Sequence, residues 1–233
     1  MFVVRRSEDR GHANHGWLEA KHTFSFSSYY DEKHMGFRAL RVINQDRVAP
    51  GKGFAPHAHN DMEIVTYVTS GALEHKDTLG NSAVIRPGDM QRMSAGTGIR
   101  HSELNSSATD DVRLLQIWLL PEREGIEPSY EQKSFLDKFT PNSWVLTASK
   151  AGREDSVKIH QDVDLYVGNF EAGLKKEFTL RSQRYGWLQI VKGRLNVNNV
   201  HDLKEGDGLA ISDETQLVLA GVSSCEFLFF DLP

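Results

Sequence analysis

The chain has 233 residues, of which 39% are hydrophobic and 25% are charged, a composition that is ordinary for a globular protein with its own core. The formal charge of −5 argues against a surface dedicated to nucleic acid, which usually shows as an excess of Lys and Arg. One cysteine cannot form an intrachain disulfide, and the longest apolar run, residues 114–120, is too short to span a bilayer. We therefore expect a cytoplasmic protein that contacts neither membrane nor nucleic acid.

The first half of the chain contains several short segments that are typical of strands. Residues 37–49, 62–77, 82–96 and 112–120 are rich in β-branched and aromatic residues and are separated by Gly, Pro and Asn. Short strands at such regular spacing indicate a β-sandwich or a barrel. Residues 130–139 are the one place where a short helix or an irregular connector is expected.

The two halves of the chain resemble each other. In the first half a strand ends at Gly71 and a later one begins after Gly88; in the second half the same features occur at Gly193 and Gly206. Internal duplication is the simplest explanation, and it predicts two similar β-barrels in tandem. The polar, proline-bearing stretch between the halves is the natural boundary. The expected division is an N-terminal barrel over 1–125, a connector over 126–140 and a C-terminal barrel over 141–233.

Two short motifs indicate a metal site. "HAH" contains His57 and His59, and "HSE" contains His101 and Glu103. Residues i and i+2 of a strand point to the same face, so each pair can converge on one point. Neutral imidazoles with one carboxylate suit a divalent transition ion that keeps open positions, whereas a closed structural zinc site usually needs cysteines. Histidines without any ligand are the alternative, which two pairs on consecutive strands make less attractive.

The chain resembles a known family. Residues 51–71 and 96–105 are similar to the first and second cupin motifs. The strings at 10–31, 35–44 and 93–103 resemble more closely the pirin family of bicupins, in particular bacterial members described as quercetin 2,3-dioxygenases. The resemblance covers nearly the whole chain. It implies an all-β fold of two tandem jelly-roll barrels, each with the cupin fold.

The carboxylate of the expected metal site is either Glu63 or Glu103. Seven residues, 64–70, stand between Glu63 and Gly71, one more than in the general cupin motif, and a shift of one residue turns a strand side chain to the opposite face. The even offset from His59 would point Glu63 inward, so the residues alone leave both candidates open. The resemblance to pirins implies that the metal ligands are His57, His59, His101 and Glu103.

Other polar residues receive structural interpretations. The positions of the second half that match the first histidine pair are Thr179 and Arg181, so the C-terminal barrel is expected to be degenerate and to hold no metal. We expect His75 to be a hairpin residue that can border the pocket, and His160 to be a surface residue. Cys225 is expected to be a core residue of a late strand.

The resemblance also implies a function. It predicts an enzyme with one mononuclear metal that opens the heterocyclic ring of a flavonol with dioxygen, so the small-molecule partners are an aromatic substrate and dioxygen. Iron(II) is the expected ion, although the ligand set would also accept Mn, Ni, Co, Cu or Zn. Glu103 is the expected catalytic residue, because a ligating carboxylate can also take a proton from the substrate.

Two other functions stay open at this stage. Some pirins are described as metal-dependent regulators that bind a transcription factor or a metabolic enzyme, and the charge of −5 suits a protein partner better than DNA. An isomerase or decarboxylase of the wider cupin superfamily would use a similar site. The degenerate second barrel argues against two-metal decarboxylases, and the pirin-like strings argue against isomerases.

Overall fold

Burial with a period of two runs through the chain and produces strands. β10 (Ile99–Leu104), for example, buries Ile99, His101 and Glu103 more deeply than the residues between them, as expected for a strand with one face inside a barrel. The computed structural model describes residues 1–233 as strands β1 to β22 with three short 3-10 helices. No helix is long and apolar enough to span a membrane.

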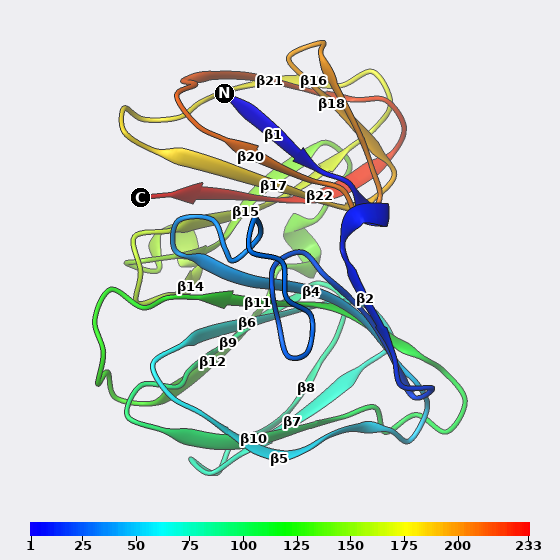
Figure 1. Cartoon of the computed structure of the whole chain (residues 1–233), viewed down its shortest axis with the longest axis vertical. Helices are drawn as coiled ribbons and strands as arrows, with labels where there is room; N and C mark the ends of the chain where they lie inside the picture. The colour runs from blue at the N-terminus through cyan, green and yellow to red at the C-terminus, as the bar shows by residue number, and fades with distance from the viewer.

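The first half of the chain forms the lower barrel of Figure 1. Its other strands are β2 (Gly11–Asn14), β3 (Leu18–His22), β4 (Leu40–Val48), β5 (Gly53–His59), β6 (Glu63–Ser70), β7 (Leu73–Asp77), β8 (Ser82–Ile85), β9 (Asp89–Ser94), β11 (Val112–Leu119) and β12 (Ser129–Ser134). They make a seven-stranded sheet in the order β12-β9-β6-β11-β4-β3-β2 and a four-stranded sheet in the order β5-β10-β7-β8. All pairings in this barrel are antiparallel.

The second half forms the upper barrel, which repeats this design of a seven-stranded and a four-stranded sheet. Its strands are β1 (Phe2–Arg5), β13 (Ser143–Ser149), β14 (Val157–Lys158), β15 (Asp164–Phe170), β16 (Lys175–Thr179), β17 (Tyr185–Lys192), β18 (Arg194–Val197), β19 (His201–Lys204), β20 (Gly208–Ile211), β21 (Gln216–Gly221) and β22 (Cys225–Leu232). The sheet orders are β1-β20-β17-β22-β15-β13-β14 and β16-β21-β18-β19. The 3-10 helices are η1 (Ser7–Asp9), η2 (Leu136–Lys138) and η3 (Arg153–Asp155).

The predicted duplication is confirmed at the turns that revealed it. Gly71 and Gly193 end β6 and β17 with the same positive φ of 76°. Gly88 and Gly206 precede β9 and β20 with φ of 95° and 83°. A residue with a side chain is strained at such angles, so both halves need glycine at the same two turns.

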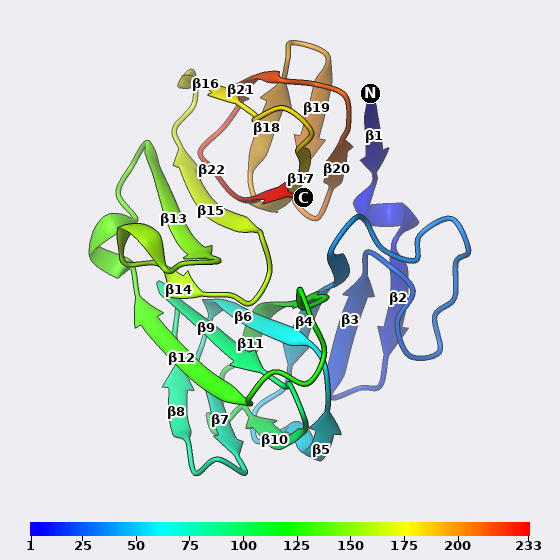
Figure 2. The ribbon, with the colours of Figure 1, turned by 90° about the vertical axis from the view of Figure 1, so that its left-hand side faces the viewer.

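The expected division has one boundary between the barrels, but the chain crosses between them twice, once after β1 and once after β12. Residues 2–5 form β1, which pairs with β20 of the second barrel, so the chain begins in the upper barrel of Figure 2 before it enters the lower one. Within the expected connector, residues 129–134 form β12 and pair with β9 of the first barrel. Each crossing covers a strand edge whose backbone groups would otherwise lack partners. Residues 130–139, where we expected a short helix or an irregular connector, instead form strand β12 up to Ser134 and then the single turn of η2.

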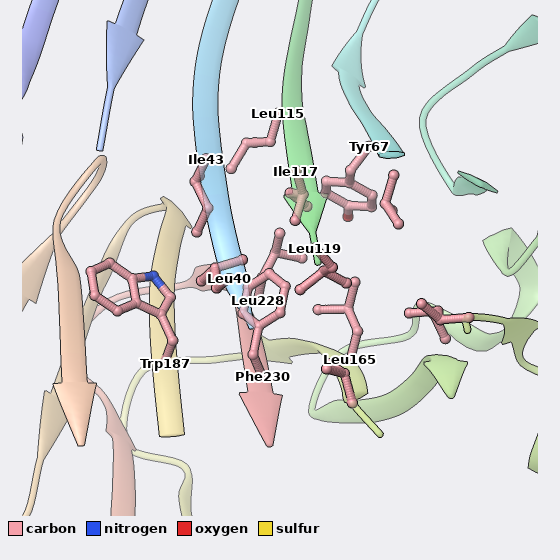
Figure 3. Packing of buried hydrophobic residues seen from close by; sticks show 14 of the residues in the cluster. Leu40, Ile43, Tyr67, Leu115, Ile117, Leu119, Leu165, Trp187, Leu228 and Phe230 are labelled. Carbon is pink, nitrogen blue, oxygen red and sulfur yellow. The ribbon is translucent and has the colours of Figure 1, made fainter. Parts of the chain in front are cut away.

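The largest apolar core lies between the two barrels. A cluster of 23 buried residues joins the outer faces of the two large sheets. Ile43, Leu115 and Ile117 of the first barrel pack toward Leu228 and Phe230 of the second, as Figure 3 shows. Because both sheets bury the same cluster, each barrel depends on the other for the burial of its largest apolar face.

The interiors of the barrels differ. The second barrel is filled by 14 buried residues, among them Phe227 and Phe229, with Trp144 packed against them. The first barrel contains two smaller clusters, of 8 and 4 buried residues. Beside these clusters a cavity of about 470 Å³ remains, lined by residues of β3, β4, β5, β10 and β11.

Candidate metal centre

The register of β5 and β10 brings three histidines together. His57 lies directly opposite His101, and His59 lies opposite Ile99 on the same pair of strands. The ring centroids of His57 and His101 are 4.4 Å apart, and those of His59 and His101 are 5.0 Å apart. One nitrogen from each of the three rings lies within 4.8 Å of the others. The two histidine motifs therefore form one cluster, which we call the histidine cluster (His57, His59 and His101).

Glu103 lies beside the histidine cluster and is buried. Its Oε2 accepts a hydrogen bond of 2.9 Å from Nε2 of Gln116, and a register shift between His101 and Glu103 interrupts the pairing with β5. The carboxylate belongs to a second group, in which His75, His101 and Glu103 have ligand atoms within 4.8 Å of one another. The four expected residues are therefore divided between two groups: His57 and His59 are grouped with His101, whereas Glu103 is grouped with His101 and His75.

Glu63, the rival carboxylate, faces the second half of the chain. Its Oε2 accepts a hydrogen bond of 3.0 Å from the backbone N–H of His160 and lies 3.3 Å from Nδ1 of the same residue. Its side chain is 1% exposed, so this contact is buried between the barrels. The side chain of Glu63 therefore points away from the interior of the first barrel, as the count of residues from Gly71 predicts. Our expectation of a surface position for His160 is wrong, because its side chain is only 22% exposed at this contact.

The nitrogens of the histidine cluster are suited to a metal ion. Nδ1 of His57 lies 2.8 Å from the carbonyl oxygen of Ala55, so Nδ1 donates its proton there and Nε2 keeps a free lone pair. Nε2 of His101 is buried and has no hydrogen-bond partner in the chain. An orphaned imidazole nitrogen beside two further imidazoles is the donor set of a divalent transition ion, so the residues fit such an ion.

Burial also favours the protonation states that a metal ligand needs. It lowers the pKa of His101 to about 3, with the charge of His57 as the next cause, and lowers the pKa of His59 to about 4. Both rings are therefore neutral near pH 7, and a cation does not compete with a proton for them. Burial raises the pKa of Glu103 to about 7, so its carboxyl can hold or release a proton near neutrality.

The histidine cluster opens onto the cavity of the first barrel. His57, His59 and Glu103 contribute to the cavity wall, and the ring of Trp118 lies 4.9 Å from that of His59. The other aromatic wall residues are Trp17, Phe26 and Phe54. The volume of about 470 Å³ suits a small aromatic molecule.

Family models match both barrels. Residues 3–119 match the model described as Pirin, and residues 146–232 match the model described as Quercetinase C-terminal cupin domain. The chain belongs to the pirin family. The expected fold of two tandem cupin barrels is thereby confirmed.

Relatives of this pirin match over its whole length. It is 47% identical over 233 residues to a quercetin 2,3-dioxygenase of Escherichia coli K12, covering 100% of this chain and 99% of the relative. It is 41% identical to a pirin-like protein of Caulobacter vibrioides, covering 99% of each. The crystal structure of YhhW from E. coli superimposes with a TM-score of 0.96 at 46% identity and covers 100% of this chain and 98% of that one. A structure of the bacterial pirin YhhW in complex with nickel(II) gives the same TM-score and identity, with 100% and 99% coverage.

This pirin holds His101 through His75, which we expected to be a hairpin residue that can border the pocket and whose contact with His101 was not predicted. His75 on β7 lies opposite Glu103 and is 1% exposed. Its Nδ1 lies 3.5 Å from Nδ1 of His101, and its Nε2 lies 3.0 Å from Oδ2 of Asp77. A carboxylate, a first imidazole and a second imidazole thus form a chain that ends at the histidine cluster. The spacing of His75 and Asp77 in "HKD" puts both side chains on one face of a strand. It indicates a contact with His101 only once β7 is known to pair with β10.

The cavity walls of this pirin were also not predicted. Phe26, from the N-terminal arm, lines the cavity. His22, from the same arm, also lines the cavity and contacts Asn44 through a buried hydrogen bond of 2.8 Å. His22 reaches the barrel interior because β3 pairs with β4, a pairing that no local pattern in the sequence reveals.

Proposed function

We propose that this pirin is a mononuclear-metal dioxygenase that opens the heterocyclic ring of a flavonol such as quercetin with dioxygen. The observation that carries the proposal is the histidine cluster, which opens onto an aromatic-walled cavity of about 470 Å³ in only one of two otherwise similar barrels. The full-length identity of 47% to a quercetin 2,3-dioxygenase supports the same activity.

One divalent transition ion is proposed, with His57, His59, His101 and Glu103 as its ligands. The fit rests on the free imidazole nitrogens of the cluster and on the position of Glu103 beside His101. Iron(II) is the proposed ion, because histidines with one carboxylate and open positions are typical of non-haem iron oxygenases. Mn, Ni, Co, Cu and Zn also suit this donor set, and nickel(II) is the ion named for the E. coli relative.

The ion, when bound, supplies Lewis acidity that lowers the pKa of the flavonol 3-hydroxyl. Glu103 is placed to accept that proton, because burial raises its pKa to about 7 and Gln116 holds only one of its two oxygens. The rings of Trp118 and Phe54 flank the cluster and would hold a flat aromatic ligand against it while excluding water.

Turnover of quercetin tests this proposal directly. Protein loaded with Fe(II), Mn(II), Ni(II), Co(II) or Cu(II) would be mixed with quercetin in air, and the loss of flavonol absorbance and the release of carbon monoxide would be followed. The proposal predicts both signals with at least one ion, and His57→Ala should abolish them. Tight metal binding with no turnover by any ion would contradict it and favour the regulatory role.

The cytoplasm is the proposed location. Cys225 is the only cysteine, and it is free and buried. The fold therefore does not rely on disulfide bonds, which suits a reducing compartment. The second candidate function is regulation by binding a transcription factor or a metabolic enzyme. Metal binding without turnover in the experiment above would favour it.

A further inference from the structure

Asp46 on β4 is a buried carboxylate with no hydrogen-bond partner. The residue is 6% exposed, and its Oδ1 is fully buried and unpaired. Most buried polar groups are hydrogen-bonded, because an unpaired one loses its contacts with water and gains nothing in return. An unpaired buried carboxylate therefore calls for an explanation in terms of something that binds to it.

Asp46 faces the cavity of the first barrel. It shares a face of β4 with Asn44, which lines the same cavity, and with Val48, which belongs to an apolar cluster inside the barrel. Glu103 and the aromatic ring of Trp118 line the cavity as well. The carboxylate thus borders the space that a ligand of the histidine cluster would occupy.

Four neighbouring side chains are already paired, His22 with Asn44 over 2.8 Å and Gln116 with Glu103 over 2.9 Å. The compensating cation Arg10 attracts the charge of Asp46, but its Nε has no hydrogen-bond partner and its Nη1 and Nη2 give their hydrogen bonds elsewhere. These go to the side chain of Gln45 and to the carbonyl oxygens of Gly206 and Lys21.

A second metal ion is a poor occupant for this position. Asp46 belongs to neither group of residues whose ligand atoms lie within 4.8 Å of one another. The surrounding wall contains aromatic residues, with Trp17 and Trp118 among them. A carboxylate beside aromatic wall residues matches a flat ligand that carries a hydrogen-bond donor at its edge.

We infer that Asp46 is a specificity-determining residue, which accepts a hydrogen bond from a ring hydroxyl of the aromatic ligand other than the hydroxyl that meets the metal. The inference rests on the proposed function and narrows its substrate class to flavonols that carry further ring hydroxyls. A site built to bond a hydroxyl discriminates strongly against an analogue that lacks it, because the carboxylate is then left unpaired.

Binding without turnover tests the inference. Protein loaded with Zn(II), which is redox-inert, would be titrated under nitrogen with quercetin and with 3-hydroxyflavone, which keeps the 3-hydroxyl and lacks the other ring hydroxyls. Quenching of tryptophan fluorescence reports binding, because Trp17 and Trp118 line the cavity. We expect the wild type to prefer quercetin by roughly tenfold, as one net hydrogen bond to the carboxyl group allows.

The variants separate a specific contact from a general loss of structure. Asp46→Leu, of similar size, should bind the two ligands about equally, and Asp46→Asn should keep part of the preference. Asp213→Asn, at an exposed position of the second barrel, is the matched control and should behave as the wild type does. Circular dichroism would confirm folding, and Asp46→Asn alone decides the matter if Asp46→Leu does not fold.

The outcomes are distinct from those of the turnover experiment. A wild type without preference, or a preference that both Asp46 variants retain in full, would overturn the inference even if quercetin is turned over. A preference that is lost in the Asp46 variants would uphold it even if no metal supports turnover in air. In that case Asp46 selects a hydroxylated ligand for a protein that is not the proposed dioxygenase.

Discussion

At the scale of single residues, the choice between Glu63 and Glu103 determines which carboxylate can serve the metal. Both are buried, but Glu63 is bonded to the backbone of His160 across the barrel contact, whereas Glu103 lies beside His101. Burial alone therefore does not identify a ligand. The direction of the side chain does, and in a strand one residue of offset reverses it.

Metal content should distinguish these residues. Loss of a ligand weakens metal binding, so we expect His57→Ala and Glu103→Ala to lose most bound metal. Glu63→Ala should keep it, but should unfold more easily by about 1–3 kcal/mol, because the buried N–H of His160 loses its acceptor. Elemental analysis after gel filtration measures the metal, and urea denaturation measures the stability. A Glu63→Ala protein stripped of metal would show that our ligand assignment is wrong.

The pH dependence of metal-free protein tests the environment of Glu103. Its pKa is raised from 4.5 to about 7 by burial, so the stability it contributes is complete below pH 4.5 and is lost as the pH rises to about 7. His101 acts in the opposite sense: its pKa is lowered from 6.5 to about 3, so its contribution is lost as the pH falls below 6.5. Glu103→Gln removes only the first effect. Relative to the wild type, its free energy of unfolding should therefore rise by about 3 kcal/mol between pH 4.5 and 7.

Urea denaturation at a series of pH values, with a chelator present, would measure this difference. Glu103→Gln keeps an acceptor for Gln116, so the comparison isolates the charge. Parallel stability curves for the two proteins would show that the carboxyl of Glu103 is not held in its neutral form by burial.

At the scale of elements, β10 is the strand that assembles the centre. It pairs with β5 on one side, which places His57 opposite His101, and with β7 on the other, which places His75 opposite Glu103. The chain from Asp77 through His75 fixes the ring of His101 from behind, as partners of metal-binding histidines commonly do.

Replacement of His75 should therefore weaken metal binding without removing a direct ligand. We expect His75→Phe, which keeps the ring volume, to lower the metal affinity by about 10- to 100-fold. The visible spectrum of the Co(II) protein should also change, which a purely structural role would not cause. His12→Phe, at an exposed histidine, is the control. An unchanged affinity measured by competition with a chelator would remove His75 from the centre.

The elements also show why the sequence predicts only part of the site. His57, His59 and His101 could be assigned from the period of two, because that rule is local. The pairing of β7 with β10, which gives His75 its role, depends on residues far apart in the chain, and so does the arrival of His22 and Phe26 at the cavity. The strand at 129–134 was missed for the same reason, since it forms to cover the edge of β9.

At the scale of the whole molecule, the two duplicated barrels share a design but differ in their interiors. A cluster of 14 buried residues, most of them aliphatic, fills the interior of the second barrel, while the first keeps a cavity and the histidine cluster. The shared core and the exchange of β1 join the barrels. We propose the division 1–125, 126–140 and 141–233 as a description of the duplication, with β1 and β12 as its two exceptions.

The shared core should make the two barrels unfold together. Ile117 is fully buried in this core, so Ile117→Ala should lower the free energy of unfolding by about 2–5 kcal/mol. The loss should appear in one transition seen alike by circular dichroism and by tryptophan fluorescence. Val200→Ala, at a residue that is 72% exposed, should change the stability by less than about 0.5 kcal/mol. Two separate transitions, with only one of them shifted, would contradict the dependence of the barrels on each other.

Anomalous scattering from crystals of the metal-loaded protein tests the proposed centre most directly, because it identifies both the ion and its neighbours. We predict a single peak in the first barrel, within about 2.0–2.2 Å of nitrogens of His57, His59 and His101 and of a carboxylate oxygen of Glu103. A peak coordinated by Glu63, a peak that Glu103 does not approach, or a peak inside the second barrel would contradict the account.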